Sequence, residues 1–423
     1  MIFNLSKYNG DWKTKELREL GCFNRGKSKH RPRNDKRLFS SGGYPLIQTG
    51  DVKEANIFIS KHSNEYNDFG LAQSKLWPEG TLCITIAANI AETAILSYEM
   101  CFPDSVVGFN AYEEECSEVF MHYIFTYIRK AIQSRIQGSI QDNINLEYLT
   151  GLSFKIPERD KLRSIEKTLL DLDSKIELNN KINAELEAMA KLIYDYWFVQ
   201  FDFPDESGKP YKSSGGQMVY NEELKREIPE GWEVRKVNEF MNFGSGFPFK
   251  SSSYVDKGKF KVITIKNVQD GFMDIEKTDY LDVIPKKLPE YCKLKLGDIL
   301  ISLTGNVGRM CRVFDDRCLL NQRVGKMIGK EEYFDFFYLL LNRPEERLNI
   351  ENIASGSSQK NLSPVKAVNR SFVNPDYSIL NEFNKIITPV TEKLVKNSNE
   401  NKKLGELRDW LLPMLMNGQV TVN

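Results

Sequence analysis

The stretch IEKTLLDLDSKIELNNKINAELEAMAKLIYDYW, residues 165–197, has the spacing of a coiled-coil helix. Its seam positions follow one another at steps of four and three residues, which is the heptad period. As a helix, this stretch would be about 50 Å long at 1.5 Å per residue. Of its ten seam positions, two are Asn179 and Asn183 and eight are apolar: Ile165, Leu169, Leu172, Ile176, Leu186, Ala190, Ile193 and Trp197.

A second stretch with the same spacing, FNKIITPVTEKLVKNSNENKKLGELRDWLLPML, occupies residues 383–415, 218 positions further along. Both seams carry Asn at the same two places. The two stretches are therefore expected to pair as one coiled coil, and the alternative is that each packs separately on its own domain. The ten second-seam positions are Phe383, Ile387, Val390, Leu394, Asn397, Asn401, Leu404, Arg408, Leu411 and Leu415.

The paired asparagines predict the direction and register of the coiled coil. If the helices run antiparallel about their midpoints, Asn179 meets Asn401 and Asn183 meets Asn397. Their amides can then hydrogen-bond each other, whereas a slipped register would bury them against leucine at about 1–3 kcal/mol each. We expect these four residues to fix the register.

The rest of the chain also repeats. GTLCITIAANIAETAIL (80–96) aligns with GDILISLTGNVGRMCRV (297–313), and CFPDSVVGF (101–109) with CLLNQRVGK (318–326). YPLIQTGDV (44–52) aligns with FKVITIKNV (260–268), and SFKIP (153–157) with SFVNP (371–375). Matches in the same order at nearly the same shift indicate an internal duplication, and the paired segments have the apolar patterns of β-strands.

The sequence thus predicts an α+β protein in which two pseudo-repeated α+β domains are joined by a long antiparallel two-helix coiled coil. The predicted parts are a first domain (1–157), a central helix (158–200), a connector (201–230), a second domain (231–375) and a C-terminal helix (376–418).

Composition bounds the class of protein. The 423 residues carry 58 basic and 58 acidic side chains, but residues 1–37 hold eleven bases against four acids. No apolar run approaches the roughly 20 residues of a membrane span, so we expect no membrane partner. The seven cysteines form no CxxC pair, and His30, His62 and His122 are scattered. We therefore expect a cytoplasmic protein with buried thiols and no metal site.

Several of these segments, taken in order, resemble the DNA-specificity (S) subunit of type I restriction-modification systems. The resemblance covers nearly the whole chain. It rests on GSIQDNI with LTGLSFKIP, their copies GSSQKNL and NRSFVNP, and on YPLIQTGDV, DSVVGF, IYDYWFVQFDFP and LRDWLLPMLMNGQV. The second domain departs from the first at IKNV and RVGK, which suggests that the two domains read different sequences.

The resemblance implies a specific division of labour. Each α+β unit would be a target-recognition domain that reads one half of a bipartite target in double-stranded DNA. The helices would set the unread spacer and dock two methyltransferase (M) subunits, with restriction (R) subunits bound through them. The subunit itself would be non-catalytic and need no cofactor.

Two other functions are weighed against this one. NPDY, 374–377, is close to the Asn-Pro-Pro-Tyr signature of amino-methyltransferases, so a stand-alone DNA adenine methyltransferase is an alternative. However, no glycine-rich strand–turn–helix for S-adenosylmethionine accompanies it, and no GxxxxGK[ST] phosphate loop occurs. A coiled-coil scaffold without DNA contact is the other alternative.

The run RGKSKHRPRNDKR, 25–37, has the composition of a loop that can approach phosphates and base edges. The alternative is a solvated surface loop. Its predicted DNA-binding residues are Arg25, Lys27, Lys29, Arg31, Arg33, Asn34, Lys36 and Arg37.

Polar residues at turns supply further DNA-binding candidates, although turn residues of these types are commonly structural. Gln48 and Thr49 follow the strand-like YPLI, and Lys266 and Asn267 hold the matching place in the second domain. The remaining candidates are Asn89, Lys250, Ser252, Ser253, Asn306 and Arg309.

The repeated Gly-Ser-x-Gln-x-Asn motif contains Gln141 and Asn143 in one copy and Gln359 and Asn361 in the other. Because it is shared where specificity should differ, we expect a structural or backbone-contacting role. Lys360 gives the second copy a charge suited to phosphate.

Aromatic and leucine side chains crowd the helix ends at IYDYWFVQFDF and LRDWLLPML. They form either local core or a docking surface for partner subunits. The predicted docking residues are Tyr194, Tyr196, Trp197, Phe198, Trp410 and Leu412.

Overall fold

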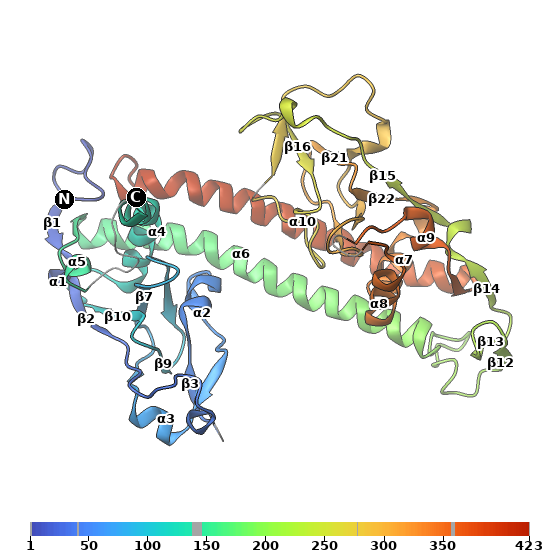
Figure 1. Ribbon diagram of the computed structural model, residues 1–423, viewed down its shortest axis with the longest axis horizontal. Helices are drawn as coiled ribbons and strands as arrows, with labels where there is room; N and C mark the ends of the chain where they lie inside the picture. The colour runs from blue at the N-terminus through green and yellow to red at the C-terminus, as the bar shows by residue number, and fades with distance from the viewer. Residues whose placement is uncertain (1, 40–41, 138–145, 277, 357–359, 423) are drawn as a thin grey trace. The chain divides into compact units, whose positions relative to one another are not determined.

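A computed structural model describes residues 2–39, 42–137, 146–276, 278–356 and 360–422 (Figure 1). The chain forms two compact units. Unit 1 comprises Met1–Glu177 and Lys403–Asn423, and unit 2 comprises Leu178–Lys402. Each unit is described by itself below.

Unit 1 contains two main sheets. The five-stranded sheet has the order β2 (Gly21–Arg25), β10 (Val106–Ala111), β7 (Leu82–Thr85), β8 (Thr93–Leu96) and β4 (Phe58–Ile59). The four-stranded sheet has the order β5 (Asn64–Tyr66), β3 (Tyr44–Leu46), β9 (Met100–Cys101) and β6 (Leu76–Trp77). A third, two-stranded sheet joins β1 (Lys13–Glu16) to β11 (Ser153–Ile156). The helices are α1 (Leu17–Leu20), α2 (Thr49–Glu54), α3 (Asp68–Ala72), α4 (Glu118–Gln137) and α5 (Leu146–Thr150), with a 3-10 turn η1 (Lys36–Leu38).

Unit 2 repeats this plan. Its first sheet has the order β15 (Met241–Ser245), β22 (Val324–Gly329), β19 (Ile299–Ser302) and β20 (Met310–Arg312). Its second has the order β17 (Asp279–Leu281), β16 (Phe260–Ile263), β21 (Cys318–Leu320) and β18 (Lys293–Leu294). β14 (Glu233–Lys236) pairs with β23 (Ser371–Asn374), and β12 (Met218–Asn221) with β13 (Arg226–Pro229). The helices are α7 (Phe334–Leu341), α8 (Pro344–Ile353) and α9 (Pro364–Val368), with 3-10 turns η3 (Val237–Glu239), η4 (Ser251–Ser253), η5 (Glu290–Cys292) and η6 (Glu331–Tyr333).

The strands common to the two units follow the same order, and unit 1 adds β4, which pairs parallel with β8 at the edge of its first sheet. In both, the second sheet contains one parallel pair: β3 with β9 in unit 1 and β16 with β21 in unit 2. The other sheets match as well, since β10 lies between β2 and β7 just as β22 lies between β15 and β19. The predicted duplication is therefore present in the fold, and the predicted α+β class is confirmed.

Two long helices complete the units. They are α6 (Arg159–Tyr194), which continues into a π-helical turn η2 (Asp195–Val199), and α10 (Tyr377–Met416). In unit 1 Asp173 of α6 contacts Arg408 of α10. In unit 2 Asn179 contacts Asn401, and Tyr194 lies against Phe383 with ring centroids 6.2 Å apart. Between the two contacts in unit 2, residue numbers rise along α6 as they fall along α10, so the helices pair antiparallel there.

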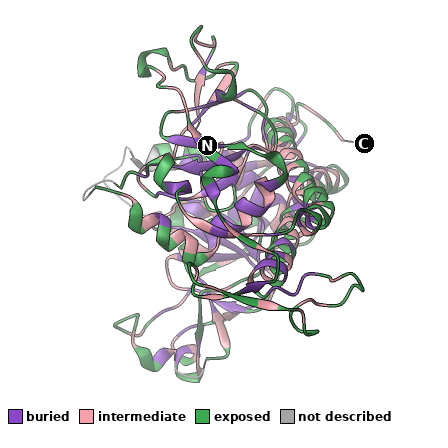
Figure 2. Cartoon of the chain, turned by 90° about the vertical axis from the view of Figure 1, so that its right-hand side faces the viewer, coloured by how far each residue is buried: buried purple, intermediate pink, exposed green. Residues whose placement is uncertain are grey.

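Each unit buries its own apolar core. The unit 1 core joins sheet strands, α4 and the ends of the long helices, and α4 lies against β7, β8 and β10. The unit 2 core is rich in aromatic residues from η2, α7 and α10. Figure 2 shows the buried residues, in purple, concentrated in strands and inner helices, with exposed residues along the loops. Seam positions that face these cores are apolar because burial of hydrocarbon drives the packing.

The segment predicted as a connector, 201–230, is packed against unit 2. Phe203 stacks on Trp232 with ring centroids 4.8 Å apart, and Asp202 accepts hydrogen bonds from the Ser213 backbone and hydroxyl at 2.7 and 2.6 Å. These contacts lower the pKa of Asp202.

Within the described residues no helix is long and apolar enough to cross a bilayer.

Candidate nucleic-acid interface

The predicted basic run begins at Arg25, the last residue of β2, and continues into the connection between β2 and β3 of unit 1. We call residues 25–37 the first basic loop. Seven of its eight predicted residues are exposed, and Lys27 is half-buried. Buried Leu38 follows the loop, and the Ser74 hydroxyl donates to the Lys27 carbonyl at 2.8 Å, so both ends of the loop are attached to the fold.

Carboxylates orient the arginines of this loop. Asp35 accepts from Arg37 Nη2 at 2.7 Å and from Arg37 Nε at 3.1 Å, and His30 Nε2 lies 2.8 Å from the same carboxylate. These contacts lower the pKa of Asp35 and raise that of Arg37. Arg33 donates to Asp104 at 2.6 Å. A guanidinium that is already oriented loses less side-chain entropy when it meets a phosphate or a base edge.

Three other basic side chains of the loop have no acidic partner among the described residues. Arg25, Lys29 and Lys36 are exposed and make no ion pair within the part of the chain that the structure describes. Charges of this kind are suited to phosphates, because their contact releases counterions from the duplex.

Unit 2 has a basic loop at the same place in its topology. The connection between β15 and β16, residues 246–259, is the second basic loop, and it contains the predicted residues Lys250, Ser252 and Ser253, all exposed. Sequence reasoning missed two exposed lysines in this loop and two more between β17 and β18. The signal was present as a local excess of lysine, but only the sheet order relates these segments: Lys257, Lys259, Lys286 and Lys287.

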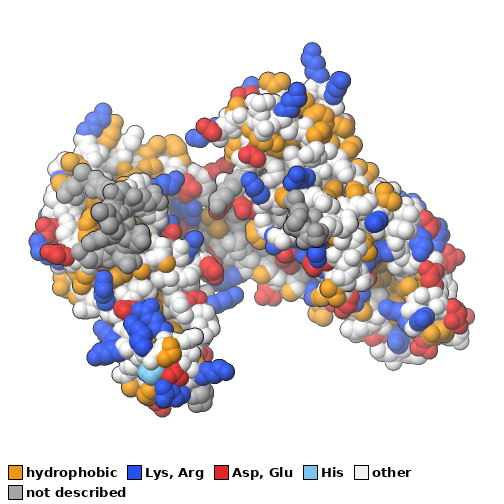
Figure 3. All heavy atoms as spheres, viewed as in Figure 1, with side chains coloured by type: hydrophobic (Ala, Val, Ile, Leu, Met, Phe, Trp, Pro, Cys, Tyr) orange, Lys and Arg blue, Asp and Glu red, His pale blue; other side chains and the backbone are white. Residues whose placement is uncertain are grey.

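Basic side chains gather visibly in both units. Figure 3 shows Lys and Arg at the end of unit 1 that carries α3 and, in unit 2, around the tip beyond β16. In each unit this is the end that carries the four-stranded sheet of β3 or β16. The duplicated fold therefore presents a basic surface at equivalent positions of its two copies.

A capping turn follows β3 and β16. In unit 1 the Gln48 backbone donates to the Asp51 carboxylate at 2.7 Å, while the Gln48 side chain is exposed and Thr49 is half-buried. In unit 2 the Thr264 backbone donates to Asn267 Oδ1 at 2.8 Å. Asn267 thus takes the structural place of Asp51.

Asn267 cannot read DNA as predicted, because its amide is buried and satisfied. Only 1% of the residue is exposed, and its Nδ2 donates to the Asp274 carbonyl at 2.8 Å. The neighbouring Lys266 is exposed and remains a candidate.

The turn after β19 forms a polar cleft of about 300 Å³ in unit 2. It brings together three predicted residues, Asn306, Arg309 and Lys360, with Asp270 and Arg347. Arg309 donates to Gln269 Oε1 at 2.6 Å, and Arg347 donates to Asp270 at 2.5 Å. The cleft thus holds oriented guanidinium groups beside an exposed asparagine.

The repeated Gly-Ser-x-Gln-x-Asn motif borders this cleft in its second copy. The Gly305 backbone donates to the Lys360 carbonyl at 3.0 Å, and the Leu362 backbone to the Leu303 carbonyl at 2.8 Å. These bonds give residues 360–362 a structural role in supporting the turn. Gln141, Asn143 and Gln359 lie outside the described residues.

The matching turn of unit 1, after β7, is less polar. Half-buried Asn89 lies between Ala88 and Ala91, and both alanines have positive φ, 61° and 62°. Arg129 of α4 lies 3.0 Å from Glu92, which neutralises its charge locally. The two copies therefore share a backbone and differ in charge at this turn.

The four seam asparagines lie together in unit 2. Asn179 Nδ2 donates to Asn401 Oδ1 at 2.9 Å, and Asn397 Nδ2 donates to Asn183 Oδ1 at 2.9 Å. Asn179 and Asn397 are each 1% exposed. The structure brings together the same two pairs that the antiparallel register predicts.

Comparison with known proteins places this architecture. Residues 9–188 and 229–372 match the family described as the type I restriction modification DNA specificity domain. The chain belongs to this family. The resemblance seen in the sequence is thus confirmed.

Relatives of this specificity family match along the whole chain. The chain is 24% identical over 434 residues to the type I restriction enzyme MjaIX specificity subunit of Methanocaldococcus jannaschii, covering 99% of the chain and 96% of that protein. It is 24% identical over 473 residues to the type I restriction enzyme HindI specificity subunit of Haemophilus influenzae, covering 97% and 100%. The solved S subunit of a type I restriction-modification system from M. genitalium shares the fold, with a TM-score of 0.61, 17% identity and coverage of 98% and 99%.

Most of the predicted docking residues do not form a surface in this specificity-family chain. Tyr194, Trp197 and Phe198 are at most 7% exposed and pack in the unit 2 core, and Leu412 is 6% exposed in the unit 1 core. Their burial removes them from any docking surface. Tyr196 at 37% and Trp410 at 57% are the exposed members of the set.

NPDY, the methyltransferase-like sequence, is the start of α10. Asn374 accepts from the Tyr333 hydroxyl at 3.0 Å, and Pro375 is buried. Asp376 accepts from the Ser378 backbone at 2.8 Å, which caps the helix. These side chains are committed to ending one domain and beginning a helix.

Six of the seven cysteine thiols are buried as predicted, and Cys22 is exposed. The seven cysteines are unpaired, and burial raises the pKa of Cys101 to about 11 and of Cys311 to about 12. Among the described residues, no three His, Cys, Asp or Glu side chains gather as metal ligands.

Proposed function

We propose that this chain is the DNA-specificity subunit of a type I restriction-modification complex. The observation that carries the proposal is the duplication: one two-sheet fold occurs twice, with a basic loop at the same topological position in each copy. Membership of the DNA specificity family supports the same conclusion.

Each copy is proposed to read one half of a bipartite target in double-stranded DNA. The recognition domains are residues 1–157 and 231–375, separated in the chain by a central helix (158–200) and a connector (201–230) and followed by a C-terminal helix (376–418). The two half-sites are expected to differ in sequence, because the corresponding turns of the two domains differ in charge. The β7 turn carries an Arg–Glu pair, while the cleft at the β19 turn carries excess positive charge.

Contacts with DNA are assigned by exposure and charge. The exposed Lys and Arg side chains of the first basic loop are proposed to bind phosphates, and Asn34 is proposed to reach the edges of the DNA bases. In unit 2 the second basic loop and the cleft formed by Asn306, Arg309 and Lys360 take the equivalent roles. Gln48, Thr49, Asn89 and Lys266 are retained as candidates of the capping and turn segments.

The long helices are proposed to set the unread spacer and to dock two methyltransferase subunits, through which restriction subunits bind. Exposed Trp410 and Tyr196 are the proposed apolar anchors, since aromatic residues are enriched in interfaces. The chain itself is proposed to be non-catalytic and cofactor-free and to act in the cytoplasm.

Mapping of methylated bases tests this proposal. Genomic DNA would be modified by the chain together with its cognate methyltransferase and then sequenced for methylated adenine or cytosine. The expected result is an interrupted, two-part motif, and no modification without the methyltransferase. Methylation by the purified chain with S-adenosylmethionine alone, or a continuous motif, would contradict the proposal.

A further inference from the structure

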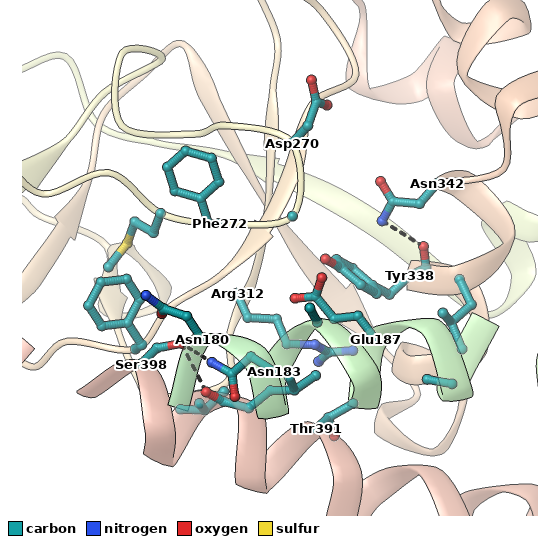
Figure 4. Close-up of a pocket in the computed structure, with 18 of the residues that line it drawn as sticks. Asn180, Asn183, Glu187, Asp270, Phe272, Arg312, Tyr338, Asn342, Thr391 and Ser398 are labelled. Atoms are coloured by element: carbon teal, nitrogen blue, oxygen red, sulfur yellow. Dashed lines mark hydrogen bonds between the residues drawn. The ribbon is translucent and has the colours of Figure 1, made fainter. Parts of the chain in front are cut away.

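Unit 2 contains a pocket of about 570 Å³ that the proposed DNA-reading role does not use. It lies between the long helices on one side and the loop 270–273, β20 and α7 on the other (Figure 4). Its volume falls in the range of small-molecule sites, which are mostly apolar with a few placed polar groups.

Charges inside the pocket are paired with one exception. Arg312 donates to Asp335 at 2.6 Å, and Arg347 to Asp270 at 2.5 Å. Glu187 of α6 is an exposed residue at the edge of the pocket, and it makes no ion pair or hydrogen bond within the part of the chain that the structure describes. Desolvation raises the pKa of its carboxyl, and the Arg312 guanidinium offsets part of that rise. A carboxylate without an ion pair of its own favours a cationic ligand.

Aromatic side chains form the walls around this carboxylate. In Figure 4 Glu187 points toward Tyr338, and Phe272 lies across the pocket on the loop. Phe272 is 60% exposed, and the ring of Tyr338 already carries the Arg312 guanidinium at 4.4 Å from its centroid. Aromatic faces attract cations, and their edges and the apolar lining accept a carbon stem.

The internal repeat shows what this fold can hold at the equivalent place. A shift of 218 residues relates Ala190 to Arg408 and Thr391 to Asp173. In unit 1 the Arg408 guanidinium donates to Asp173 at 2.6 Å, and that carboxylate also accepts from the Tyr123 hydroxyl at 2.8 Å. In unit 2 the two positions carry short side chains and line the pocket. Unit 2 thus leaves space where unit 1 seats an arginine.

We infer that the pocket binds an organic cation, a guanidinium or ammonium group on a short carbon chain. The charged group would meet Glu187, and the stem would lie between Phe272 and Tyr338. Asn183 and Ser398, which are hydrogen-bonded at 3.4 Å, offer amide and hydroxyl groups on the helix side.

Calorimetric titration of the full chain tests the inference. The probes are n-butylguanidinium and its neutral isostere n-butylurea. We expect saturable binding of the cation by the unaltered chain and at least about tenfold weaker binding of the urea, since tenfold corresponds to about 1.4 kcal/mol. Glu187→Gln should weaken binding of the cation to a similar extent.

Control variants make the result specific. Glu185→Gln removes the same charge from an exposed position on the same helix outside the pocket and should leave binding unchanged. Ala184→Phe, which fills the pocket from its rim, should abolish binding, and circular dichroism would verify that each variant is folded. No saturable binding by the unaltered chain, or equal binding by Glu187→Gln, would overturn the inference.

A third probe separates two sources of the cation. Acetyl-arginine amide presents the same group on a peptide backbone. Binding as tight as that of n-butylguanidinium would support a protein side chain as the natural occupant. Binding of n-butylguanidinium alone would support a free small cation.

Discussion

Four asparagines in the helix seam are paired across the two helices, and we expect them to specify one register. Asn397 donates to Asn183 at 2.9 Å in a site where only 1% of Asn397 is exposed. A buried amide is costly when its partner is removed, whereas apolar replacement of both partners is nearly neutral. The asparagines thus favour one register without adding much stability.

Replacing one member of an asparagine pair should therefore cost more than replacing all four. Asn397→Leu is expected to lower the free energy of unfolding by about 1–3 kcal/mol, because the side-chain Oδ1 of Asn183 loses its hydrogen-bond donor. The quadruple variant with Leu at 179, 183, 397 and 401 should regain stability but populate slipped or intermolecular pairings. Urea denaturation and light scattering would measure the two effects, and a quadruple variant that stays a uniform monomer would contradict the register role.

Backbone strain at one alanine gives a second residue-level prediction. Ala88 has a φ of 61° in unit 1, whereas its repeat counterpart is Gly305, at 73°. A left-handed backbone costs an alanine about 1 kcal/mol relative to glycine. Ala88→Gly is expected to raise the free energy of unfolding by about that amount, and Ala87→Gly, outside the left-handed region, should lower it. Thermal unfolding of both variants would decide, and equal shifts would contradict the strain.

A buried histidine predicts how stability depends on pH. Burial lowers the pKa of His122 from 6.5 to about 3, with a further contribution from Arg129. Above pH 6.5 the His122 ring is neutral in both the folded and the unfolded protein. Below pH 6.5 the ring binds a proton in the unfolded chain but stays neutral in the folded chain. Stability should then fall by up to about 1.4 kcal/mol per pH unit between about pH 6.5 and 3.

His122→Asn removes this titration and retains a polar group near the Thr93 hydroxyl, which lies 3.1 Å from the His122 ring. The variant should lose less stability between pH 6.5 and 4 than the unaltered chain. Urea midpoints across this range would measure the difference, with His62→Asn as a control at a partly exposed position. Parallel curves for His122→Asn and the unaltered chain would refute the assignment.

At the scale of elements, the two basic loops share a place in the fold but not a sequence. The β2–β3 and β15–β16 connections occupy the same place beside equivalent sheets, yet one is rich in arginine and the other in lysine and serine. Arginine can form paired hydrogen bonds with guanine or phosphate, whereas lysine acts as a point charge. Different loops on one framework suit domains that read different half-sites.

The basic side chains of the first basic loop that lack a described acidic partner are expected to contact DNA phosphates. Replacing Arg25, Lys29 and Lys36 by Gln should weaken DNA binding by the complex with its methyltransferase, and should reduce the slope of log affinity against log salt by about 0.9 per lost phosphate contact. A matched triple, Lys167, Lys191 and Lys403 to Gln, removes three exposed charges from the long helices. Fluorescence anisotropy over a salt series would measure both, and an unchanged slope for the loop variant would remove the loop from the interface.

At the scale of the whole molecule, the proposed spacer rule depends on helix length. A heptad adds about 10 Å to a helix at 1.5 Å per residue and preserves the seam. Inserting one heptad in both α6 and α10 should therefore lengthen the unread spacer of the DNA target while each half-site stays the same. Methylation mapping would measure the new motif, and altered half-sites would contradict the rule.

The sequence alone determined the features that repeat along the chain. The seam period predicted the helices, the asparagine positions predicted their antiparallel pairing, and the shifts of 216 to 218 residues predicted two similar domains. These properties are readable because heptad spacing and strand alternation are local, and a duplication preserves them in order.

Only the tertiary structure decided which side chains are free to act. Asn267 was a predicted DNA contact and Trp197 a predicted docking residue, but long-range packing buries both side chains. Conversely, Arg309 and Lys360 are 51 residues apart in the chain and share one cleft only because the β19 turn lies beside residues 360–362. Burial and convergence depend on contacts between distant segments, which a local pattern does not contain.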